Sequence, residues 1–141
     1  MNIIKQRVIQ AMELTNEFYQ NLEDVDLRLK IPNVPSNTIG EQAYCIIGAR
    51  ESYLEALKEG QWSKFRCSLT DSTEKELVVN KLTESNANIG LFLEKHIDVE
   101  ININFLIDLL EHEVQHHGQL IRFAYANKLI FPESWHNRYT V

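Results

Sequence analysis

The chain has 141 residues, of which 44% are hydrophobic and 24% charged, and its formal net charge is −6. This length and apolar content fit a single domain over residues 1–141 and exclude a disordered tail. Five glycines and three prolines exclude collagen-like or linker-like character, and two cysteines are too few for a disulfide scaffold.

Charge and hydropathy also limit the partners that we expect. The basic residues are scattered among acidic ones and form no stripe, so we expect no nucleic-acid binding. No apolar signal segment follows the N-terminus and no run approaches ~18 apolar residues, so we expect no membrane span. These features predict a cytoplasmic protein in which Cys45 and Cys67 are reduced thiols.

Four long segments carry helical periodicity, and short polar or proline-bearing breaks separate them. They cover about residues 3–22, 38–59, 71–96 and 104–127. Four helices of this length predict an all-α, antiparallel four-helix bundle, and residues 33–37 leave a longer crossover connection open as an alternative topology.

Local signals mark several helix ends. Thr38 and Glu41 have the spacing of a capping box, and Gly60 stands where a helix C-cap is expected. Thr73 and Glu76 have the spacing of a second capping box.

Two remaining segments lie outside the four helices. The run 99–105 alternates in the manner of a strand, but we interpret it as a loop that leads into the last helix. The C-terminal tail is rich in aromatic residues, so Trp135 and Tyr139 are expected to pack back on the bundle.

The last helix carries the informative cluster. His112 and His116 are four residues apart, so their rings lie on one helix face, about one turn from each other. The apolar stripe of this helix includes Phe105, Leu109 and Phe123 on the same face, which places both imidazoles toward the interior. Burying two imidazoles is costly unless each nitrogen finds a partner. The pair therefore predicts a divalent metal site, and two hydrogen-bonded core histidines are the alternative.

The same residues match the H-E-x-x-H pattern of zinc metallopeptidases, in which the glutamate is the general base. Here Glu113 would take that role. The extended pattern would need glycine at position 119 and histidine at 122, where this chain has Gln119 and Arg122.

Three segments resemble the DinB/YfiT-like family of metal-binding four-helix bundles. The first is His112-x-x-x-His116-x-Gly118-Gln119, the second is residues 36–53, and the third is the tail 131–135. The resemblance implies a zinc or nickel site with one histidine from the second helix and two from the last. By alignment the second-helix histidine falls on Cys45, whose thiolate would complete a set of three ligands.

Other residues near the motif are alternative metal ligands or candidate catalytic residues. Gln42 is a weaker substitute for Cys45, and Glu41 becomes a carboxylate candidate if the alignment slips by one turn. Gln119 and Glu113 are the candidate catalytic residues, Gln119 as a hydrogen-bond donor to a ligand and Glu113 as a base. His117 is expected to be exposed.

The resemblance implies a function that the residues alone do not give. Some family members are metal- and thiol-dependent transferases, so the implied partners are a small-molecule thiol and an electrophile, and the implied assembly is a homodimer. Two alternatives stay open. One is a small zinc metallopeptidase, and the other is a non-catalytic bundle that has lost its metal.

Overall fold

The computed structural model describes residues 2–141, and every regular element among them is helical. The elements in chain order are α1 (Asn2–Gln20), the 3-10 helix η1 (Asp24–Arg28), α2 (Ile39–Glu59), α3 (Lys75–Lys95), the 3-10 helix η2 (Asp98–Glu100), α4 (Ile103–Ala126) and α5 (Glu133–Arg138). The four predicted helices and the strand-free 99–105 segment are confirmed. No helix in this part of the chain is long and apolar enough to cross a bilayer.

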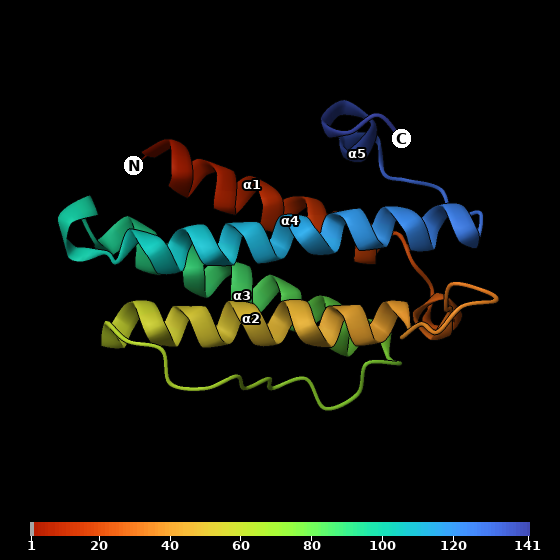
Figure 1. Cartoon of the computed structure of the whole chain (residues 1–141), viewed down its shortest axis with the longest axis horizontal. Coiled ribbons are helices and arrows are strands. Elements are labelled where there is room, and N and C mark those ends of the chain that lie inside the picture. Colours follow the sequence, from red (N-terminus) through yellow and green to blue (C-terminus); the bar gives the residue numbers. More distant parts are fainter. Residues whose placement is uncertain (1) are drawn as a thin grey trace.

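The four long helices lie side by side, but they are not all antiparallel to their neighbours. Helices α1 and α2 each pack against both α3 and α4. Figure 1 shows α1 and α4 running in one direction and α2 and α3 in the other. The predicted antiparallel arrangement is therefore right for α1–α3 and α2–α4 and wrong for α2–α3 and α1–α4.

The connection 60–74 explains this difference, because it runs back along α2 before α3 begins (Figure 1). Extended chain advances ~3.3 Å per residue and a helix only ~1.5 Å, so this connection is long enough to return along the helix. The Ser52 hydroxyl fixes it to α2 by accepting from the Arg66 N–H at 2.9 Å and donating to the Arg66 carbonyl at 3.1 Å. The Phe65 ring lies so close to Gly48 that a Cβ there would come within 2.1 Å of it.

One predicted capping box forms and the other does not. Thr38 Oγ1 accepts from the Glu41 N–H at 3.0 Å, and the Glu41 carboxylate accepts from the Thr38 N–H at 3.1 Å. Thr73 instead donates to Asp71, at 2.6 Å. Helix α3 begins at Lys75, whose N–H donates to Asp24 of η1 at 2.8 Å. A carboxylate that is distant in sequence thus takes the place of the predicted local cap.

The interior consists of two apolar clusters, one toward each end of the long helices. The C-terminal tail completes the first cluster, as predicted. Trp135 is fully buried beside Phe18, and its indole N–H donates to the Leu14 carbonyl at 2.8 Å. Between the two apolar clusters lie buried polar side chains from all four long helices.

Candidate functional site

His112 and His116 form a pair of imidazoles on α4, which we call the histidine pair. Their ring centroids are 4.5 Å apart. His116 is buried with 8% of its surface exposed, and His112 is half-buried. The four-residue spacing on an unbroken helix therefore brings the two rings together, as the sequence predicts.

The nitrogens of the pair differ in their partners. The Gln42 amide oxygen on α2 lies 2.5 Å from Nδ1 of His116. Because a carbonyl oxygen only accepts, this contact assigns the proton of neutral His116 to Nδ1 and leaves the lone pair on Nε2. In contrast, Nδ1 of His112 is buried and has no hydrogen-bond partner within residues 2–141. A buried polar atom without a partner is unusual in a folded protein, and a bound ion or water would satisfy it.

Burial keeps both rings of the pair neutral. Desolvation lowers the pKa of His112 below its usual 6.5. Desolvation and the neighbouring His112 lower the pKa of His116 to about 4, and an interaction with Gln119 opposes this shift. At neutral pH both imidazoles therefore have a lone pair, which is the form that binds metal.

Cys45, the third predicted ligand, does not form a ligand group with the histidine pair in this structure. Cys45 is half-buried on α2, and burial together with Glu41 raises the pKa of its thiol. Among the residues described, no group of three or more His, Cys, Asp or Glu side chains is arranged to hold a metal ion. The α2 side chain that contacts the pair is Gln42, one turn before Cys45. Glu41 is exposed and is used in the cap of α2.

Glu113 belongs to a buried ion pair. The carboxylate is 1% exposed and the Arg50 guanidinium is fully buried. The Nε and Nη2 atoms of Arg50 each lie 2.9 Å from one carboxylate oxygen of Glu113. This bidentate contact and the Thr15 hydroxyl outweigh the desolvation of the carboxylate, and the pKa of Glu113 is lowered.

The remaining donors of Arg50 bind the other helices. Nη1 donates to the Asn16 side chain at 3.1 Å, the Leu82 carbonyl at 3.0 Å and the Ser85 hydroxyl at 3.2 Å. Nη2 also donates to the Met12 carbonyl at 3.2 Å. A single guanidinium thus joins α1, α2, α3 and α4.

His117 extends this network toward the C-terminal tail, and the prediction that it is exposed is wrong, since it is 1% exposed. The Thr15 hydroxyl lies 2.6 Å from Glu113 and 2.7 Å from Nε2 of His117. Because the carboxylate can only accept, Thr15 donates to it and accepts from the Nε2–H of His117. Nδ1 of His117 then accepts from the Tyr139 hydroxyl, at 2.7 Å. We call Arg50, Glu113, Thr15, His117 and Tyr139 the buried polar cluster.

A signal for this cluster is present in the sequence. Arg50 stands within the apolar stripe of its helix, at helical spacing from the buried Ala43, Ile46, Leu54 and Leu57. An arginine at such a position requires a buried acidic partner. Thr15 and Tyr139 carry no comparable signal, because their contacts depend on how α1 and the tail pack against α4.

The ion pair with Arg50 occupies the atoms that Glu113 would need to act as a general base. Both of its oxygens are engaged by Arg50, and one also accepts from Thr15. A general base needs an oxygen that reaches the proton to be removed. This geometry gives no support to a peptidase reaction with Glu113 as the base. Gln119 is exposed, beside His116.

No protein-family model matches this chain, and no curated protein sequence matches it.

Proposed function

We propose that the chain binds a divalent transition metal, zinc or nickel, through His112 and His116, in a four-helix bundle of the DinB/YfiT-like kind. One observation carries this proposal. Among residues 2–141, Nδ1 of His112 is buried without a hydrogen-bond partner, next to the ring of His116 at a centroid distance of 4.5 Å, and burial lowers the pKa of both rings. A metal ion is the ligand that satisfies two neighbouring neutral imidazoles at once.

The donor set fits such an ion in part, because two ligands are assembled and a third is needed. Gln42 holds His116 by Nδ1 and so presents Nε2, which is the way that metal-binding histidines are usually oriented. We propose Cys45 as the third ligand, since it is one turn from Gln42 on the same helix. A side-chain rotation would be required, because the thiol and the pair do not form a ligand group as they stand.

The proposed activity is the transfer of a small-molecule thiol to an electrophile: the sulfur forms a bond to the electrophilic carbon, the leaving group departs with the electron pair of the broken bond, and the thiol proton goes to solvent. The metal, when bound, would supply a Lewis acid that lowers the pKa of a thiol ligand. The chain's own part is to hold the two imidazoles neutral and in place. The Arg50–Glu113 pair contributes to this, because it fixes the turn of α4 between the two histidines.

Metal titration with a competing chromophoric chelator tests the binding step. The protein is purified without a metal-affinity column, as wild type, His116→Ala, Cys45→Ser and His136→Ala. His136 is exposed and far along the chain from the pair, so it serves as the matched control. We expect wild type and His136→Ala to bind one equivalent of zinc or nickel and His116→Ala to lose at least about 100-fold in affinity. Equal affinity in wild type and His116→Ala would contradict the proposal.

Thiol transfer is tested separately, with metal-loaded wild type, a low-molecular-weight thiol and an alkylating electrophile. Conjugation that is faster than with the same concentration of free metal, and slowed in His116→Ala, supports the activity. Conjugation at the rate of free metal would leave a metal-binding protein without this activity.

A further inference from the structure

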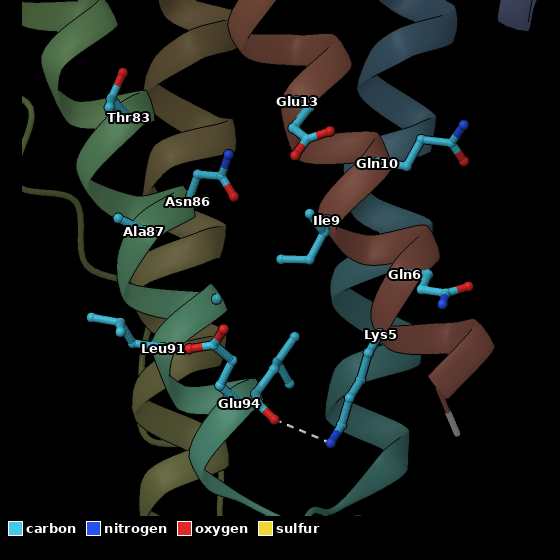
Figure 2. A pocket seen from close by; sticks show the side chains of 12 residues that line it. Lys5, Gln6, Ile9, Gln10, Glu13, Thr83, Asn86, Ala87, Leu91 and Glu94 are labelled. Atoms are coloured by element: carbon cyan, nitrogen blue, oxygen red, sulfur yellow. Dashed lines mark hydrogen bonds between the residues drawn. The ribbon is translucent and has the colours of Figure 1, made fainter.

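A groove lies between α1 and α3, away from the histidine pair on α4. Its volume is about 870 Å³. Figure 2 shows that Ile9 of α1 points across the groove toward α3 and that Glu13 and Asn86 also turn toward the space between the two helices. The proposed function makes no use of this surface.

The groove has an apolar centre that is open to solvent. Ile9 is half-buried, Ala87 on α3 is exposed, and Leu91 stands at the outer edge with its side chain turned away from α1 (Figure 2). At Gly90 an added Cβ would meet only the Cδ1 atom of Ile9, at 3.9 Å. The space above Gly90 is therefore free for a side chain from outside. An apolar surface of this kind in a water-exposed groove is typical of a binding site.

The charge of the rim limits what can bind there. Three charged side chains line the groove, namely Lys5, Glu13 and Glu94. The Lys5 ammonium is already engaged, since it donates to the carbonyls of Leu93 at 3.1 Å and His96 at 2.9 Å and lies 3.4 Å from Asp98. The carboxylates of Glu13 and Glu94 have no ion-pair partner within residues 2–141, and both are exposed. The rim therefore has one carboxylate without an ion-pair partner near each end, Glu13 at one end and Glu94 beside Lys5 at the other.

The dimensions suit a helix. The lining runs over residues 83–94 of α3, a length of roughly 16 Å at about 1.5 Å per residue. A guest helix of about three turns would lie along this length, with its apolar stripe over Ile9, Ala87 and Gly90. Its flanks would then be next to Glu13 and Glu94.

We infer that this groove binds a basic amphipathic helix of a partner protein. Apolar side chains of the partner would fill the space above Gly90, and lysine or arginine residues at its flanks would pair with Glu13 and Glu94. A second copy of this chain suits the groove less well, because it would bring its own unpaired carboxylates against these two in a protein of net charge −6.

The probe is a fluorescent 15-residue peptide of leucine and lysine in an amphipathic helical pattern, and a peptide with glutamate in place of lysine is its control. Binding is followed by fluorescence anisotropy with the full chain. Gly90→Leu fills the groove, and it replaces a poor helix former by a good one, so folding is retained. Glu13→Gln with Glu94→Gln removes the rim charge. Glu59→Gln with Glu133→Gln removes the same charge from exposed positions elsewhere.

We expect the basic peptide to bind wild type and the Glu59/Glu133 control, and to bind both groove variants at least about tenfold more weakly. The acidic peptide should not bind. The inference is overturned if the basic peptide fails to bind, or if it binds wild type and Gly90→Leu equally. It is also overturned if light scattering finds a dimer that Gly90→Leu dissociates, since the groove would then belong to a second copy.

Discussion

Two groups of polar side chains meet at neighbouring positions of α4, and they differ in how their hydrogen-bonding atoms are satisfied. In the buried polar cluster, each side chain finds partners inside the protein, from the guanidinium of Arg50 to the ring of His117. In the histidine pair, Nδ1 of His112 has no partner within the described residues. Glu113 directly follows His112 in the chain. Adjacent side chains of a helix point in different directions, so one belongs to the buried polar cluster and the other to the histidine pair. The comparison separates polar groups that are satisfied inside the fold from one buried nitrogen that is not.

The largest expected effect comes from breaking the ion pair of the buried polar cluster. Glu113→Ala leaves the fully buried Arg50 without its counter-charge, and we expect the free energy of unfolding to fall by about 3–5 kcal/mol. Urea denaturation measures this change. Replacing both partners, by Arg50→Met with Glu113→Leu, should recover only part of the loss, because Asn16, Ser85 and Thr15 then lose their partners. A loss below about 1 kcal/mol in the single variant would show that the pair does not hold the helices together.

A pH dependence should follow from the buried histidines of both groups. The pKa of His116 and that of His117 are each lowered from 6.5 to about 4, mainly by burial. Between these values the unfolded chain takes up protons that the folded chain does not, so stability falls as the pH drops from about 6.5 to about 4. The slope is at most about 1.4 kcal/mol per pH unit for each histidine.

Urea denaturation of the metal-free protein between pH 7 and pH 5 measures this slope. His117→Asn removes one of the histidines with a lowered pKa, so its slope should be clearly smaller than that of wild type but not zero, since His116 and His112 remain. Equal stability of wild type at pH 7 and pH 5 would contradict the burial of both rings.

The histidine pair should be far more tolerant of substitution than the ion pair. Since Nδ1 of His112 has no partner to lose, we expect His112→Ala to cost less than about 1 kcal/mol in the presence of a chelator. With zinc at 100 times its dissociation constant, wild type should gain about 2.7 kcal/mol and His112→Ala should not. Thermal unfolding with and without zinc measures both. A gain of the same size in the variant would place the metal elsewhere.

The smallest effect is expected at the edge of the buried polar cluster. Tyr139→Phe removes the hydroxyl that donates to His117, at the cost of about 0.5–1.5 kcal/mol. Because Tyr139 does not contact the histidine pair, metal affinity should not change. A loss of metal binding in Tyr139→Phe would mean that the two groups act as one unit.

Much of the fold could be predicted from local sequence patterns. The apolar periodicity located all four long helices, and the Thr38–Glu41 box and Gly60 marked the ends of α2. The direction of α3 could not be predicted, because it depends on the path of residues 60–74, which side chains of α2 such as Ser52 hold in place. The start of α3 was missed for a similar reason, since its cap comes from Asp24.

The candidate site was predicted in part. Helical spacing was enough to place His112 and His116 together and facing inward. Helical spacing did not predict that His117 and Glu113 are buried, because their burial depends on Thr15 and Arg50 from other helices. Cys45 as a ligand stays a prediction, and the contact of Gln42 with His116 is the feature of α2 that the structure adds.

The most direct test of the account is the metal content of the protein, measured by elemental mass spectrometry after purification without a metal-affinity column. Wild type, His116→Ala and Cys45→Ser are compared. We expect close to one equivalent of zinc or nickel in wild type and none in His116→Ala, and a loss in Cys45→Ser would make the thiolate the third ligand. An absence of metal in wild type, even after incubation with zinc and nickel, would contradict the account and leave the two histidines as packing residues.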